Sequence, residues 1–200
     1  MLEFLEEVRK ELEELEVARE ELIKLTREIR INSTKAIAAV HSGRFNEAEE
    51  RLRAARDILE KVKEFKKYPE IYYAITHDAM QEFVEAVAFA NLVSGKEIPE
   101  FKDMGIETPP ILTGLADLVG ELRRYSLDLM RKGEVSEAEK CINTMEEIYS
   151  SLITFSFPEK LVPGLRHKVD VARQLIERTK SDWLAARLIE EIGQGLKKWE

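Results

Sequence analysis

The segment Met80-Gln-Glu-Phe-Val-Glu-Ala-Val-Ala-Phe89 places two carboxylates inside an otherwise apolar stretch. Apolar residues continue on both sides of it, from Tyr72 to Val93, so the stretch is predicted to be a central helix. Glu82 and Glu85 lie three residues apart, and side chains at that spacing are neighbours on one helix face. A buried acid without a partner is costly, so these acids need a cation, a partner or a function.

A second pair of carboxylates occurs in Asp117-Leu-Val-Gly-Glu121, again on one face of a predicted helix. The residues around Asp117 are apolar: Leu115, Ala116, Leu118 and Val119. If the two helices face each other, four acids converge on one spot. Their mutual repulsion then requires a compensating cation, and a divalent metal ion is the usual one.

Apolar residues recur at three- and four-residue spacing along most of the chain, which predicts an all-α fold with seven helices and no sheet. The expected helices cover about residues 2–41, 46–67, 70–94, 112–132, 136–157, 159–179 and 182–200. The first is the longest, and its amino-terminal half carries a Leu stripe between Glu and Arg residues. Proline and glycine between residues 96 and 110 predict the only long non-helical connection.

Two similar segments lie between predicted helices: Gly43-Arg-Phe-Asn-Glu-Ala-Glu49 and Gly133-Glu-Val-Ser-Glu-Ala-Glu139. In each, a glycine is predicted to end one helix, and Asn46 or Ser136 to cap the next. The segments are 90 residues apart, which does not match the 34-residue period of tetratricopeptide repeats. Shared turn chemistry is therefore favoured over a helical-repeat scaffold.

The composition sets limits on the class of protein. The chain has 200 residues and a net charge of −8, which suits one domain and argues against binding nucleic acid over its whole outer surface. A local basic patch remains compatible with that charge. No apolar stretch approaches the length of a membrane span, so we expect a cytoplasmic protein. The single Cys141 excludes an internal disulfide.

The domain organisation is predicted to divide near residue 180. We expect residues 1–180 to form one helical domain. Residues 181–200 are then an amphipathic helix, starting at Asp182 and containing Trp183 and Trp199, that packs on the same domain or on a neighbouring subunit.

The four acids point to a particular metal chemistry. A cluster of oxygen ligands without His or Cys selects Mg²⁺ or Mn²⁺ over zinc. Such ions activate a water molecule and stabilise the charge that develops on a phosphoryl group. Di-iron sites in helical bundles use Glu-x-x-His pairs, and this sequence contains none. We expect His41, His77 and His167 to be surface or hydrogen-bonding residues.

Two motifs resemble a known family. Met80-Gln-Glu-Phe-Val-Glu-Ala-Val-Ala-Phe89 and Leu112-Thr-Gly-Leu-Ala-Asp-Leu-Val-Gly-Glu-Leu-Arg-Arg124 are similar to the central motifs of the translin and Trax family, and look closer to the Trax branch and its archaeal relatives. The layout of the chain agrees with that family from the long first helix to Thr179, and the segment after Asp182 resembles it less.

The resemblance implies a seven-helix translin-like bundle that assembles into a hollow homo-oligomer, an octamer, holding RNA or single-stranded DNA inside. Trax subunits are metal-dependent endoribonucleases, and their catalytic acids fall on Glu82, Glu85 and Asp117. Glu121 takes the further metal-chelating position. All four chemical types are retained, which favours a catalytic subunit that uses Mg²⁺ or Mn²⁺.

Nucleic-acid binding requires positive side chains that an enclosed cavity could concentrate on its inner wall. The candidates are Arg27, Arg30, Lys35, Arg123 and Arg124. The basic group Arg166-His167-Lys168 is a weaker candidate, since it could equally face solvent. Two alternatives to an endoribonuclease remain open: an assembly protein that binds RNA or single-stranded DNA without cutting, and a structural helical scaffold.

Overall fold

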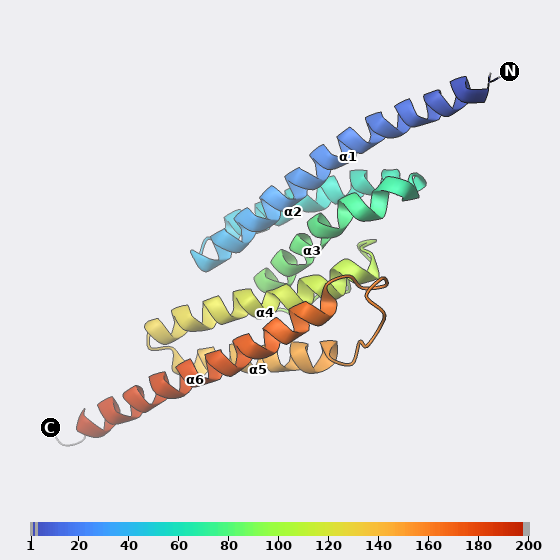
Figure 1. Cartoon of the computed structure of the whole chain (residues 1–200). Helices are drawn as coiled ribbons and strands as arrows, with labels where there is room; N and C mark the ends of the chain where they lie inside the picture. Colours follow the sequence, from blue (N-terminus) through green and yellow to red (C-terminus); the bar gives the residue numbers. More distant parts are fainter. Residues whose placement is uncertain (1, 3, 198–200) are drawn as a thin grey trace. The chain divides into compact units, whose positions relative to one another are not determined.

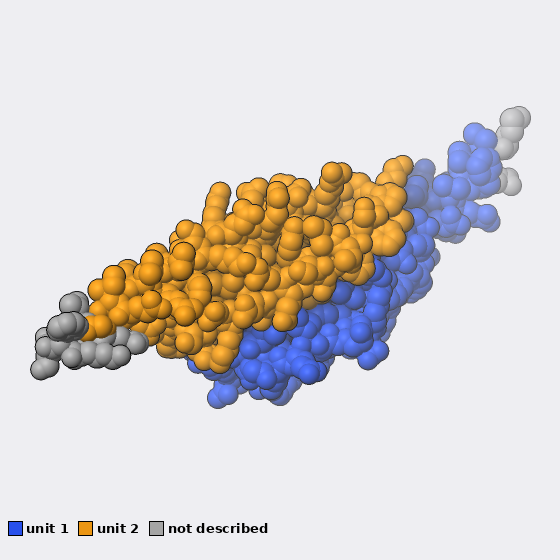
Figure 2. Space-filling model, turned by 90° about the horizontal axis from the view of Figure 1, so that it is seen from below, with its two compact units in different colours: residues 1–111 blue, residues 112–200 orange. Residues whose placement is uncertain are grey.

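The computed structural model describes Leu2 and residues 4–197, and the regular elements in that part of the chain are all helical (Figure 1). They are α1 (Phe4–His41), α2 (Phe45–Lys63), a 3-10 helix η1 (Glu64–Lys67), α3 (Pro69–Val93), α4 (Thr108–Arg131), α5 (Val135–Leu152) and α6 (Leu165–Lys197). The residues group into two compact units, 1–111 and 112–200, coloured separately in Figure 2.

The first unit is built on α1, which packs against both α2 and α3. Buried side chains recur on α1 at three- and four-residue spacing from Ala18 onward, including Leu22, Leu25 and Ile29. The first turns of α1 are different, because their large apolar side chains are exposed: Phe4, Leu5, Val8, Leu12 and Val17. The contribution of this long helix to the core therefore begins at Ala18.

The second unit consists of most of α4 together with α5 and α6, of which α5 and α6 pack on each other. The buried residues of α6 fall on one face, at Leu165, Val169, Ala172 and Ile176. Trp183, farther along α6, is half-buried, and its Nε1 donates a hydrogen bond to the carbonyl oxygen of Val135 at 3.1 Å. Trp199 lies outside the described residues.

The described part of the chain contains six α-helices and no strand, where the sequence predicted seven helices. The predicted break at Asp182 does not occur. Asp182 lies inside α6, and its carboxylate accepts a hydrogen bond from Arg123 instead of capping a new helix. The predicted division between residues 1–180 and 181–200 stays a prediction, although α6 runs through that point without interruption.

The two similar segments form the same turn. Gly43 and Gly133 have φ angles of 71° and 83°, the left-handed conformation that glycine adopts most easily. The next residue in each, Arg44 and Glu134, donates its backbone N–H to a carbonyl five residues back at 2.9 Å. The following helix begins at once, one residue before each predicted cap, and neither helix has a side-chain cap. Shared turn chemistry is confirmed, and the caps at Asn46 and Ser136 were wrong.

The connections also differ from the prediction. Helix α4 begins at Thr108, before Pro109 and Pro110, because the first turn of a helix has no use for the N–H groups that proline lacks. A second long connection, residues 153–164, separates α5 from α6, so the loop before α4 is not the only one. None of the helices in the described part of the chain combines the length and apolar character needed to cross a membrane.

The contrast along α1 gives a stability test. Leu22 is completely buried and Leu12 is 61% exposed, so the same substitution on one helix isolates the effect of burial. We expect Leu22→Ala to lower the free energy of unfolding by about 2–5 kcal/mol, because it removes core contacts and leaves a cavity. Leu12→Ala should change it by about 0.5 kcal/mol or less. Urea unfolding followed by circular dichroism measures both, and equal losses would contradict the burial described for α1.

Candidate metal and nucleic-acid site

The first pair of predicted site acids lies on α3 in the first unit. Glu82 and Glu85 are half-buried, between the fully buried side chains of Phe83, Val84 and Ala86. Glu82 has a hydrogen-bonding partner on α1: the Thr34 hydroxyl donates to Glu82 Oε1 at 2.8 Å. This bond fixes one oxygen of the carboxylate and leaves the other oxygen for a different partner.

The predicted basic residues of α1 lie beside this acid. Arg27, Arg30 and Lys35, together with Ile31 and Thr34, line a surface hollow of about 430 Å³. Their spacing of three and four residues places all five on one face of the helix. Because Thr34 belongs to the hollow and also binds Glu82, the basic face and the first acid pair are neighbours within one unit.

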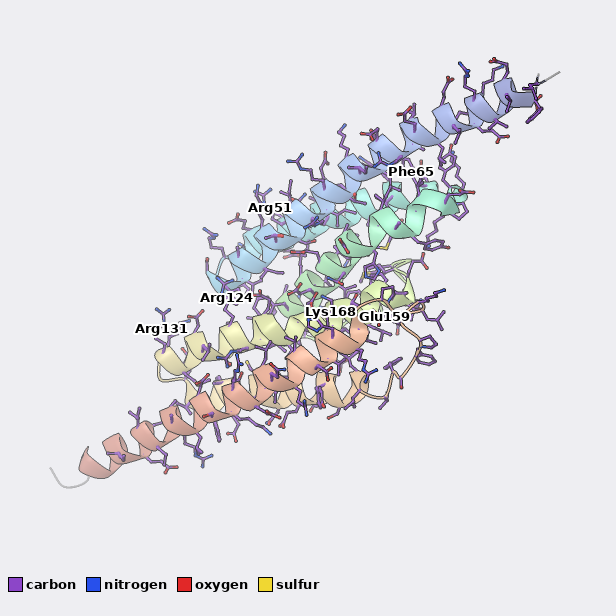
Figure 3. All side chains as sticks on the ribbon, viewed as in Figure 1. Arg51, Phe65, Arg124, Arg131, Glu159 and Lys168 are labelled. Carbon is purple, nitrogen blue, oxygen red and sulfur yellow. The ribbon has the colours of Figure 1, made fainter. Side chains whose placement is uncertain are left out.

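The second pair lies on α4 in the second unit, and its aspartate is bound to a cation of the chain itself. The Lys168 ammonium lies 2.7 Å from Oδ1 and 2.7 Å from Oδ2 of Asp117. Both side chains are 27% exposed. Glu121, one turn along the helix, has its Oε2 3.8 Å from the Arg124 guanidinium. Figure 3 marks Lys168 and Arg124 on α6 and α4.

The start of α6 is fixed in a way that determines where Lys168 lies. The backbone N–H of Gly164 donates to the carboxylate of Glu159 at 2.6 Å, and the carbonyl of Gly164 accepts the N–H of Lys168 at 3.1 Å. Gly164 has a φ of 78°. Leu165 and Val169, which flank Lys168 on the helix, are buried in the same unit.

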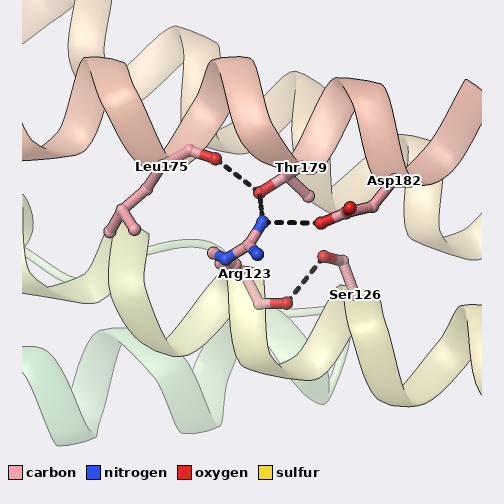
Figure 4. A network of polar contacts seen from close by, with 5 residues as sticks. All are labelled: Arg123, Ser126, Leu175, Thr179 and Asp182. Atoms are coloured by element: carbon pink, nitrogen blue, oxygen red, sulfur yellow. Dashed lines mark hydrogen bonds and ion pairs between the residues drawn. The ribbon is translucent and has the colours of Figure 1, made fainter.

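Arg123 joins α4 to α6 (Figure 4). Its Nη1 donates to Thr179 Oγ1 at 2.8 Å and to Asp182 Oδ2 at 3.0 Å. Thr179 in turn donates to the carbonyl of Leu175 at 2.6 Å, and Ser126 donates to the carbonyl of Arg123 at 2.8 Å. Arg123 thus has partners inside its own unit, whereas the Arg124 side chain is 62% exposed. Nucleic-acid binding by either residue stays a prediction.

The donor chemistry of each half fits a hard divalent cation. Both pairs offer only carboxylate oxygens, three or four residues apart on one helix face, and Asp117 already accepts a positive charge through both oxygens. Within the described residues, no group of three or more His, Cys, Asp or Glu is arranged to hold a metal ion. Each unit contributes two acids, so the convergence of all four stays a prediction.

The sequence did not reveal the partners of these acids. Thr34 and Glu82 are 48 residues apart and Lys168 and Asp117 are 51 apart, and no helical periodicity relates such positions. The one signal in the sequence is the basic group containing Lys168, which is only a weaker candidate for a nucleic-acid contact because it could equally face solvent. Cys141 offers no second chemistry, because burial, with a smaller contribution from Glu137, raises the pKa of its thiol to about 11 and keeps it protonated at neutral pH.

Two helical units with paired carboxylates on α3 and α4 define a helical-bundle protein, and comparison with known proteins specifies the family. Residues 17–181 match the model of the translin family. The chain therefore belongs to the translin family. An uncharacterized protein of Methanocaldococcus jannaschii, MJ0175, is 32% identical over 166 residues, which are 82% of this chain and 74% of that protein.

Solved structures agree with the family assignment. AfC3PO in complex with duplex RNA has a TM-score of 0.89 and 53% identity, covering 92% of this chain and 97% of that one. The crystal structure of AfC3PO gives a TM-score of 0.88 at the same identity and coverage. Apo-NeC3PO, at 24% identity and a TM-score of 0.84, covers 93% of this chain and 98% of that one and shows the common fold.

The contacts of Arg123 predict that it stabilises the second unit. We expect Arg123→Met to lower the free energy of unfolding by about 1–2 kcal/mol, because two charge-assisted hydrogen bonds are lost, one to the buried Thr179 hydroxyl and one to the partly exposed Asp182 carboxylate. Arg131→Met is the control on the same helix, since Arg131 is 78% exposed and pairs with Asp128 one turn away. Thermal unfolding compares the two. Equal melting temperatures for both variants would contradict a structural role of Arg123.

Proposed function

We propose that this protein is a metal-dependent endoribonuclease of the translin and Trax type, closer to the Trax branch. It binds and cleaves single-stranded or short RNA, or single-stranded DNA, inside a hollow homo-oligomer, an octamer. Its cofactor is Mg²⁺ or Mn²⁺. Membership of the translin family and 53% identity to AfC3PO, a protein solved with duplex RNA, support the nucleic-acid part of this proposal.

The observation that carries the proposal is the neighbourhood of Glu82. A hollow lined by Arg27, Arg30 and Lys35 contains Thr34, and Thr34 donates to Glu82 at 2.8 Å. A phosphate backbone held by these three cations would therefore run beside a predicted catalytic acid. The proximity of a phosphate-binding face and a carboxylate site is what phosphodiester hydrolysis requires.

The candidate residues have two roles, which are to hold the metal ion and to bind the nucleic-acid backbone. Glu82, Glu85, Asp117 and Glu121 would hold the metal, with Thr34 orienting Glu82. A bound divalent ion activates water and stabilises the charge developing on the phosphoryl group. Arg27, Arg30 and Lys35 hold the nucleic-acid backbone, and Arg123 and Arg124 are further candidates near the second acid pair.

A second candidate function is an assembly protein that binds RNA or single-stranded DNA without cleaving it. The ion pair between Asp117 and Lys168 favours it, because it neutralises one of the predicted catalytic acids within the chain itself. The two functions differ in one measurement: binding persists in both, and only the nuclease cuts RNA when a divalent ion is added.

Substitution of the predicted site acids tests catalysis directly. We expect Glu85→Gln and Asp117→Asn each to lower the rate of cleavage of a fluorescent RNA by roughly 100-fold or more in Mg²⁺ or Mn²⁺, because each removes a charged metal ligand. A chelator should abolish cleavage by the unmodified protein. Asp78→Asn and Asp128→Asn are the controls on α3 and α4, and both should cleave normally. Undiminished cleavage by Glu85→Gln and Asp117→Asn would discard the site.

The basic hollow gives the test of binding. We expect Arg27→Gln, Arg30→Gln and Lys35→Gln to weaken RNA binding, and each to reduce the slope of log affinity against log salt by about 1, because one phosphate contact is lost. Arg9→Gln is the control, since Arg9 is exposed on α1 outside the hollow. Fluorescence anisotropy over a salt series, with single-stranded and duplex RNA, measures the slopes. Unchanged slopes in all three variants would place the RNA elsewhere.

A further inference from the structure

The pairing of Asp117 with Lys168 has a consequence for metal binding. The ammonium of Lys168 is equidistant, at 2.7 Å, from the two oxygens of the carboxylate. It therefore occupies the edge of Asp117 that lies between its two oxygens. With 27% of each side chain exposed, neither group is fully solvated, and the attraction between them is screened less than that of a surface pair.

We propose that Lys168 is the resident counter-ion of Asp117 and competes with the divalent cation for that carboxylate, so that binding of the metal releases Lys168. The inference rests on the proposed function, because it takes Asp117 as a metal ligand. It adds a residue that sets the metal affinity of the site without being a ligand.

The competition follows from charge and from space. A hard divalent ion takes carboxylate oxygens at about 2.0–2.6 Å, depending on the ion. An ammonium held at 2.7 Å from both oxygens of the same group would lie very close to that ion, and two positive charges at such a separation repel strongly. The ammonium must leave for the metal to use both oxygens of Asp117.

Release of the ammonium requires movement of the Lys168 side chain alone. The backbone at Lys168 is held by Gly164 and Glu159 and by the burial of Leu165 and Val169 on either side. The lysine side chain has four methylene groups and can rotate away without displacing α6. When no metal is bound, Lys168 prevents Asp117 from being an uncompensated, half-buried charge. The ion pair thus compensates the Asp117 charge without metal, at the expense of a lower metal affinity.

Mn²⁺ binding to the full chain tests the competition. We expect Lys168→Met to bind Mn²⁺ roughly fivefold or more tightly than the unmodified protein, measured by the electron paramagnetic resonance signal of free Mn²⁺. Lys168→Arg keeps a cation at the carboxylate and should stay close to the unmodified protein. Lys180→Met is the matched control, because Lys180 is also on α6 and pairs with Glu146. Equal or weaker binding by Lys168→Met would overturn the proposal.

A second measurement needs no variant. Acetylation of the unmodified protein, quantified by mass spectrometry, reports how available each lysine amine is. We expect Mn²⁺ to increase the modification of Lys168 about fivefold or more, in line with the coupling above, and to leave Lys180 unchanged. No change at Lys168, or protection of it, would mean that the metal binds with the ion pair intact and would overturn the competition.

Asp117→Asn separates this inference from the proposed function. In that variant, Lys168 should be readily acetylated with or without Mn²⁺, because its partner has lost its charge. If the unmodified protein binds Mn²⁺ and cleaves RNA while Lys168 stays unreactive, the nuclease stands and the competition fails. If neither the unmodified protein nor Lys168→Met binds Mn²⁺, the metal site fails and the inference fails with it.

Discussion

A carboxylate on a largely buried helix face must be given a cation or hydrogen-bond donors, and the arrangement of this protein follows from that constraint. Glu82 and Asp117 receive different partners. Glu82 accepts a hydrogen bond from a neutral hydroxyl, whereas Asp117 is paired with an ammonium of opposite charge. Glu82 and Asp117 therefore differ in their electrostatic surroundings, because the partner of Asp117 brings a positive charge to it and the hydroxyl on Glu82 brings none.

Much of the fold could be predicted from the sequence, because helical periodicity and glycine turns are local signals. The long first helix, the apolar helix around Phe83 and the repeated turn at Gly43 and Gly133 are present as expected. The predicted helix break at residue 182 was wrong because a local signal had a competing tertiary use. Asp182 can cap a helix, but it binds Arg123 from α4, and so α6 continues through it.

The candidate site was predictable only in part, for the same reason. The spacing of the acids and the apolar residues around them can be recognised in the sequence, since both lie within one or two turns of helix. The partners of these acids come from other helices, and their identity depends on packing that no periodicity encodes. Lys168 illustrates the difference: in the sequence it is one of several basic residues, and in the structure it is the counter-ion of Asp117.

Because the chain has a net charge of −8, some of its cations are paired with its own carboxylates, and the unpaired ones are the candidates for binding a nucleic acid. Arg123 and Lys168 are held by acids of their own unit, and they satisfy internal charges before any external one. On α1, within the part of the chain that the structure describes, no ion pair involves Arg27, Arg30 or Lys35. In a chain with more acids than bases, the cations best suited to bind a polyanion are those that no internal carboxylate already pairs with, and the three cations of the hollow on α1 meet that condition although Glu82 lies nearby.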